Sequence, residues 1–107
     1  MSVPEVSPTE LAAELAGPKP PKLVDVREPD ELLISALNHT HHIPIGEVAA
    51  RIDELNPDDD LVIVCRSGAR SAKVTQFLLQ KGFKQVRNLV GGINLWADLV
   101  DPGMRKY

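Results

Sequence analysis

The chain has 107 residues, of which 43% are hydrophobic and 25% are charged, as in an ordinary globular protein. This length suits one hydrophobic core, so we expect residues 1–107 to form a single domain. The net charge of −3 at pH 7 provides no basic surface for nucleic acid or for an anionic membrane. No apolar run approaches the roughly 20 residues that cross a bilayer, and the first ten residues lack the features of an export signal. We therefore expect a cytoplasmic protein without nucleic-acid or membrane partners.

The first predicted element is a helix near the N-terminus. Ser7 is a typical N-cap residue, Pro8 suits the first helical position, and Glu10 completes a capping box with Ser7. Gly17 and the proline after it end the helix.

Apolar runs and turn residues predict the elements that follow. In chain order these are a strand over 23–26, a short helix over 31–34, a weaker strand over 40–43, a helix over 46–55, a strand over 61–65, a helix over 69–81, a strand over 85–89 and a final helix opened by Gly91 and Gly92, with Leu95, Trp96 and Leu99 in the core. Strands and helices thus alternate along the chain, which is typical of an α/β fold with a mostly parallel sheet covered on both faces.

Cys65 is the only cysteine, so it forms no disulfide within the chain and no thiolate cage for a metal. It ends the most apolar strand, and the loop Arg66-Ser67-Gly68-Ala69-Arg70-Ser71 leads from it directly into a helix. A tight turn at a helix N-terminus directs successive backbone N–H groups inward, and Gly68 allows the chain to curl there. These groups and the two arginines favour a thiolate, so we expect a reactive cysteine rather than a core residue.

Four segments resemble the rhodanese family in order and spacing, namely LVDVREPDE, IPIGEV, IVCRSGARS and NLVGGINLW. The resemblance covers most of the chain. It implies a three-layer α/β fold in which a five-stranded parallel sheet of order 3-2-4-5-1 carries helices on both faces. It also implies sulfur transfer through a persulfide on Cys65, with residues 66–71 as the substrate cradle. Asp25 and Arg27, at the end of the neighbouring strand, would brace that loop.

The function implied by the resemblance is transfer of a sulfane sulfur from thiosulfate or a persulfide donor to a thiophilic acceptor, without a cofactor. The segment 101–107 looks like the end of rhodanese domains that are fused to adenylyltransferases, which suggests a protein as sulfur acceptor.

Two other functions remain open. Cysteine-dependent phosphatases and arsenate reductases share the resembled fold, but their loop has five residues between the cysteine and the arginine. Here Arg70 follows Cys65 with four residues between them, and the smaller ring suits one sulfur atom better than a phosphate. A non-catalytic module that binds sulfur or senses redox state is the third candidate, although it would not need an intact cysteine.

The segment 36–40 departs from the family pattern. Ala36, Asn38, His39 and Thr40 stand where the family usually has His, Pro, Gly and Ala, so His39 needs either a different backbone or a tolerated left-handed conformation. We expect this departure to affect substrate preference. His39, His41 and His42 lack the spacing and the partners of a metal site, and we predict no metal there.

Overall fold

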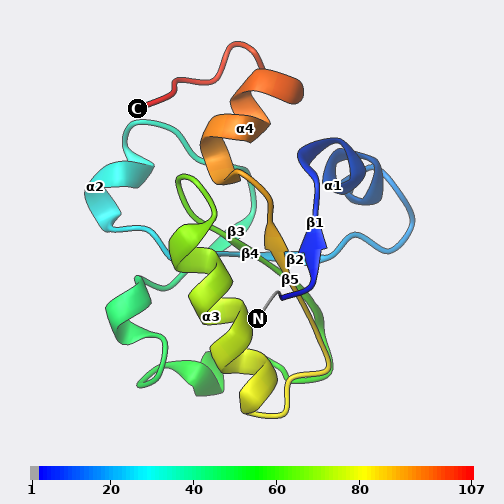
Figure 1. The fold of residues 1–107 in the computed structure, drawn as a ribbon, viewed down its shortest axis with the longest axis vertical. Helices are drawn as coiled ribbons and strands as arrows, with labels where there is room; N and C mark the ends of the chain where they lie inside the picture. Colours follow the sequence, from blue (N-terminus) through cyan, green and yellow to red (C-terminus); the bar gives the residue numbers. More distant parts are fainter. Residues whose placement is uncertain (1–2) are drawn as a thin grey trace.

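The computed structural model describes residues 3–107 and shows one five-stranded sheet with helices on both sides (Figure 1). The strands are β1 (Glu5–Val6), β2 (Lys22–Asp25), β3 (Thr40–His42), β4 (Asp60–Val64) and β5 (Gln85–Leu89). The helices are α1 (Pro8–Leu15), α2 (Pro29–Leu32), α3 (Ala69–Gln80) and α4 (Gly92–Leu99). The strand order is β1-β5-β4-β2-β3 and every neighbouring pair is parallel. This is the predicted order read from the other edge, so the predicted fold class is confirmed.

The central strand β4 separates two hydrophobic cores because its side chains alternate between the two faces of the sheet. Leu61 and Ile63 pack against the face covered by α3, whereas Val62 and Val64 pack against the face covered by α1 and α4. Cys65 continues the alternation on the α3 side and is only 1% exposed.

The predicted start of α1 is confirmed in detail. The Ser7 hydroxyl accepts a hydrogen bond from the backbone N–H of Glu10 at 3.2 Å, and the Glu10 carboxylate accepts one from the N–H of Ser7 at 3.0 Å. This capping box satisfies backbone donors that the helix itself leaves unpaired.

The helix predicted over 46–55 is wrong. The structure has two separate 3₁₀ turns instead, Ile45–Glu47 and Ile52–Glu54. Arg51, between them, has φ −109° and ψ 16°, outside the α-helical region, and its guanidinium bonds to Glu47 and Glu54. Val48 and Leu55 are still buried in the core. The segment thus buries these two side chains without forming a regular α-helix.

Three further differences concern single elements. The strand β1 has only two residues and was not located from the sequence, since it is defined by its pairing with β5. The short helix α2 begins at Pro29, two residues before the predicted start, with a capping box between Glu28 and Glu31. Leu99 is 53% exposed, so its predicted place in the core is wrong, while Trp96 is buried as expected.

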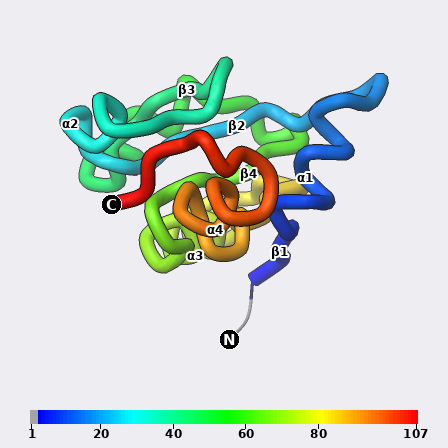
Figure 2. Tube along the Cα trace, turned by 90° about the horizontal axis from the view of Figure 1, so that it is seen from above, coloured from blue at the N-terminus to red at the C-terminus, as the bar shows by residue number. Residues whose placement is uncertain are grey.

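Segments that are distant in the sequence meet at the carboxyl ends of the strands. Figure 2 shows the C-terminus on the same side of the molecule as α2. The two segments are in contact, because the Tyr107 hydroxyl donates a hydrogen bond to the Glu31 carboxylate at 2.8 Å. Within residues 3–107, no helix is both long and apolar enough to cross a membrane.

Candidate active site

The candidate site is built around Cys65, which follows the last residue of β4 and precedes a short loop into α3. Gly68 forms the turn with φ 101°, a conformation that residues with a Cβ rarely adopt, and it is the N-cap of α3. The strand, the loop and the helix therefore follow one another in the predicted order. This places the thiol at the carboxyl end of the sheet and at the N-terminus of α3.

Three hydrogen-bonding groups of the loop surround the Cys65 sulfur. The N–H of Gly68 donates to Sγ at 3.1 Å and the N–H of Ser71 donates at 3.4 Å. The Ser71 hydroxyl lies 3.2 Å from Sγ. Burial raises the pKa of the Cys65 thiol, but the hydrogen bonds from Ser71, Gly68 and Ser67 outweigh burial and hold this pKa below the usual value.

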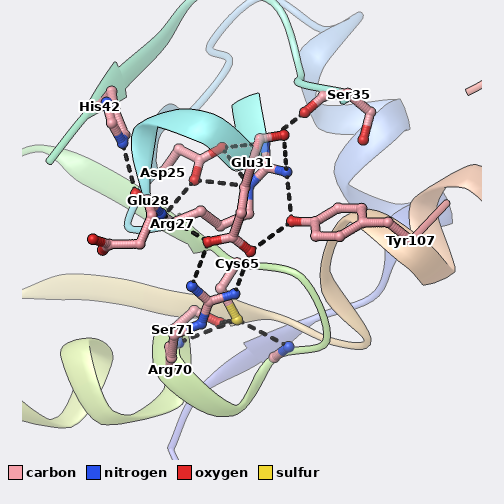
Figure 3. A network of polar contacts seen from close by, with 11 residues as sticks. Asp25, Arg27, Glu28, Glu31, Ser35, His42, Cys65, Arg70, Ser71 and Tyr107 are labelled. Carbon is pink, nitrogen blue, oxygen red and sulfur yellow. Dashed lines mark hydrogen bonds and ion pairs between the residues drawn. The ribbon is translucent and has the colours of Figure 1, made fainter. Parts of the chain in front are cut away.

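Arg70, the last arginine of the loop motif, is paired with Glu31 of α2. Its two terminal nitrogens donate to the two carboxylate oxygens at 2.7 and 2.8 Å (Figure 3). The hydrogen bonds from Arg70 hold the pKa of Glu31 at about 2, so the carboxylate is charged at neutral pH. Arg70 therefore connects the loop to α2 through a bidentate ion pair with Glu31.

Asp25 and Arg27 form an ion pair with fully buried side chains at the end of β2. Arg27 Nη2 donates to Asp25 Oδ2 at 2.8 Å, and Arg27 Nη1 donates to the Tyr107 hydroxyl at 2.9 Å. Since Tyr107 in turn donates to Glu31, the buried pair is linked to the Cys65 loop through Tyr107, Glu31 and Arg70 (Figure 3).

Arg66 is the first residue of the loop and takes no part in the Arg27–Asp25 and Arg70–Glu31 ion pairs. Its guanidinium carbon is 5.0 Å from the centre of the Tyr107 ring, within the range of a cation–π contact. Tyr107 is held in place by Asn94 of α4, whose side-chain amide donates to the Tyr107 carbonyl at 3.1 Å.

The Gly91-Gly92 pair allows the N-terminus of α4 to contact the Cys65 loop, a role that was not predicted from the sequence. The N–H of Ile93 donates to the Cys65 carbonyl at 2.9 Å, and the N–H of Asn94 donates to the Arg66 carbonyl at 3.1 Å. Gly92 has φ 59°, and a Cβ at this position would overlap the carbonyl oxygen of Cys65. The N-terminus of α4 can approach the loop this closely only because residue 92 is glycine.

The predicted cradle residues 66–71 are all brought to one place, but they differ in what they contact. Ser67, Gly68 and Ser71 supply the groups that hydrogen-bond the sulfur. Ala69 begins α3. Arg66 contacts the ring of Tyr107, and Arg70 pairs with Glu31. Glu31 lies within a motif quoted above, yet its partner could not be read from spacing. The same holds for Gly92 and Asn88, which lie within NLVGGINLW, and for Tyr107 in the segment 101–107, since spacing did not reveal their contacts with the loop.

The three histidines have different environments in the structure. His39 has φ 59°, so the residue that stands in place of a family glycine adopts the left-handed conformation. His41 Nε2 lies 2.7 Å from Glu54 Oε1, and His42 Nε2 lies 2.6 Å from the Arg27 carbonyl oxygen. Among residues 3–107, no three His, Cys, Asp or Glu side chains are grouped as a metal ion requires.

The environment of Cys65 predicts how its reactivity depends on pH. The pKa of Cys65 is lowered, so the thiolate persists to lower pH than in a free cysteine. We expect the rate of iodoacetamide alkylation to rise with pH to a midpoint below the value of about 8.5 typical of free thiols. A cysteine-containing peptide alkylated in parallel is the control. A midpoint at or above that of the peptide would show that the loop does not stabilise the anion.

Comparison with known proteins gives consistent matches to one family. A family model described as a rhodanese-like domain matches residues 7–99, a range that contains the Cys65 loop and all four helices. A sulfurtransferase from Allochromatium vinosum is 38% identical over 93 residues, which make up 87% of this chain and 87% of that protein. The Bacillus subtilis protein YrkF is 36% identical over 96 residues, and the match covers 90% of this chain but 52% of YrkF, about half its length. A crystal structure of a rhodanese-like domain protein from Staphylococcus aureus matches with a TM-score of 0.84 at 29% identity, covering 97% of this chain and 98% of that one.

Proposed function

Because this chain belongs to the rhodanese-like domain family, we propose that it is a sulfurtransferase that carries a sulfane sulfur as a persulfide on Cys65. The observation that carries the proposal is the set of hydrogen-bonding groups around a single cysteine. Backbone N–H groups of Gly68 and Ser71 and the Ser71 hydroxyl surround Sγ at 3.1 to 3.4 Å. Such a loop stabilises an anionic sulfur without a cofactor or a metal.

The reaction has two displacements at sulfur. The Cys65 thiolate attacks the sulfane sulfur of thiosulfate, a new S–S bond forms, and sulfite leaves with the electron pair of the old bond. An acceptor nucleophile then attacks the outer sulfur of the persulfide, and the Cys65 thiolate leaves with the electron pair of the bond to that sulfur. A low-molecular-weight persulfide can replace thiosulfate as donor, with a thiolate leaving in place of sulfite.

The short loop supports sulfur as cargo. Four residues separate Cys65 from Arg70, and Arg70 is occupied by both oxygens of Glu31. An arginine held in this way does not form the bidentate contact that a phosphate ester requires. The persulfide route instead needs donors close to one sulfur atom, which are those that the loop supplies.

Intact mass spectrometry tests this proposal. After treatment with thiosulfate, the protein is expected to gain the mass of one sulfur atom, and subsequent cyanide is expected to remove it with formation of thiocyanate. No mass gain with any sulfane donor would overturn the proposal. Loading without release to cyanide or thiols would instead assign a non-catalytic sulfur-binding module, and efficient hydrolysis of an aryl phosphate would assign a phosphatase.

A further inference from the structure

A buried series of polar groups connects Cys65 to strand β5. The Ser71 hydroxyl lies 3.2 Å from Cys65 Sγ and donates a hydrogen bond to Asn88 Oδ1. Asn88 Nδ2 donates to the carbonyl oxygen of Gly68 at 3.2 Å. Ser71 is fully buried and Asn88 is 4% exposed, so water does not replace these contacts. Asn88 therefore contacts both the hydroxyl beside the sulfur and the backbone of the turn.

The orientation of the Asn88 amide follows from its partners. A backbone carbonyl accepts hydrogen bonds and cannot donate them, so the amino group of Asn88 must face Gly68. The carbonyl oxygen of Asn88 then faces Ser71, and it needs a donor there. The Ser71 hydroxyl has one hydrogen, and while that hydrogen is directed at Asn88 the hydroxyl presents its lone pairs to Cys65.

We propose that Asn88 is a positioning residue that sets the direction of the Ser71 hydroxyl and thereby favours the thiol and persulfide forms of Cys65 over the bare thiolate. The thiol can donate its hydrogen to Ser71 Oγ, which leaves the bond from Ser71 to Asn88 intact. The thiolate only accepts, so the Ser71 hydrogen has to turn from Asn88 to Sγ. This leaves the buried Asn88 oxygen without a donor, which is unfavourable.

The persulfide part of this inference rests on the proposed function. In a persulfide anion the outer sulfur carries the charge, and Sγ no longer requires a charged hydrogen bond. The Ser71 hydrogen can then return to Asn88. The Ser71 hydroxyl accordingly changes partner each time Cys65 loses its sulfur, and Asn88 stabilises the loaded state relative to the unloaded thiolate.

The ionisable groups around Cys65 are held by partners other than Ser71 and Asn88. They are Asp25 and Arg27 at the end of β2, Glu31 of α2, His42 of β3, Arg66 and Arg70 of the loop, and Tyr107. None of these contacts involves Ser71 or Asn88, so substitution of Asn88 is expected to leave them in place. A change in the titration of Cys65 in Asn88 variants would therefore report on the Ser71 hydroxyl and the Gly68 turn.

The first test is the pH dependence of iodoacetamide alkylation in two variants with opposite expected signs. Asn88→Ala frees the Ser71 hydrogen for the thiolate and is expected to lower the alkylation midpoint by about 0.5 to 1 pH unit, the effect of one modest hydrogen bond. Asn88→Asp keeps an acceptor for Ser71 and adds a negative charge, so it is expected to raise the midpoint. A packing defect alone would shift both variants in the same direction.

A double-mutant cycle with Ser71→Ala separates the hydroxyl from the turn. The shift caused by Asn88→Ala is measured in the parent chain and again in the Ser71→Ala chain, and the difference between the two isolates the Ser71 route. We expect the shift to be more negative in the parent chain by about 0.5 to 1 pH unit. Equal shifts in the two chains, or shifts of the same sign for Asn88→Ala and Asn88→Asp, would overturn the proposal.

Thr75→Val is the matched control. The Thr75 hydroxyl is buried and donates to the Ser71 carbonyl at 2.8 Å, so its removal disturbs the same helical turn without touching the Ser71 hydroxyl. The midpoint is expected to stay at the parent value, and a shift as large as that of Asn88→Ala would contradict the assignment. Thermal unfolding of each variant confirms that the alkylated protein is folded.

The second test measures the equilibrium between thiosulfate and the Cys65 persulfide at fixed sulfite, above the alkylation midpoint. Asn88→Ala is expected to lower this loading constant by about 3- to 10-fold, the same factor as its midpoint shift. If Asn88→Ala shifts the alkylation midpoint but leaves the loading constant unchanged, the inference that Asn88 stabilises the persulfide is overturned. A parent protein that takes up no sulfur would overturn the proposed function instead, and the alkylation experiment would still decide the role of Asn88.

Discussion

Replacing Cys65 with serine is expected to abolish sulfur loading and sulfur transfer without unfolding the protein. A serine hydroxyl can accept the hydrogen bonds of the loop, but it does not ionise near neutral pH and forms no persulfide. We expect thiocyanate formation from thiosulfate and cyanide to fall by about 10³-fold or more, the scale seen when a covalent nucleophile is removed. The measurement is a steady-state assay beside intact mass after thiosulfate treatment.

The control for this substitution is Ser67→Ala, in the same loop. The Ser67 side chain is exposed, and the Ser67 contact to Cys65 comes from the backbone, which the substitution keeps. This variant should retain sulfur loading. Near-normal thiocyanate formation by Cys65→Ser would contradict the persulfide mechanism, because the chain has no second cysteine to take over.

The second large effect concerns stability. Asp25→Ala is expected to lower the free energy of unfolding by about 3–5 kcal/mol, because it leaves the charge of Arg27 buried without its carboxylate. Both side chains are fully buried, and Asp25 accepts hydrogen bonds from the Arg27 guanidinium and from the Arg27 backbone N–H. The free energy is obtained from urea denaturation at pH 7.

An exposed ion pair provides the matched control. Lys84 Nζ and Asp58 Oδ1 are 3.0 Å apart, and each side chain is 71% exposed. Asp58→Ala should change stability by less than about 1 kcal/mol, since water solvates the remaining lysine. The double variant Asp25→Leu with Arg27→Met should be less destabilised than Asp25→Ala alone, because no buried charge remains. Similar losses for Asp25→Ala and Asp58→Ala would show that the Asp25–Arg27 pair is not the source of the effect.

Much of the fold was predictable because its signals are local. The capping box at Ser7, the apolar run of β4 and the glycines that end or begin helices each act over a few residues of chain. The same is true of the thiol, since a strand, a glycine turn and a helix in direct succession place Cys65 among backbone donors. The resemblance to a known family then supplied the strand order, which local patterns do not contain.

The predictions that failed depend on contacts outside the segment concerned. A two-residue strand such as β1 exists only through its pairing with β5, and no periodicity can be detected in two residues. Val48 and Leu55 are buried, so the apolar spacing in 46–55 marks core positions, but this spacing does not distinguish a helix from two turns. Packing against the rest of the core decided between them.

The sequence by itself thus determined the α/β class, the position of the single cysteine and the polar turn that surrounds it. Only the tertiary structure decided which side chains hold that turn, because their partners are far apart in the chain. Arg70 and Glu31 are 39 residues apart, Arg27 and Tyr107 are 80 apart, and Ser71 and Asn88 are 17 apart. A helix cap or a hydrophobic period depends on neighbouring residues, whereas these hydrogen bonds form only after the sheet has brought the ends of its strands together.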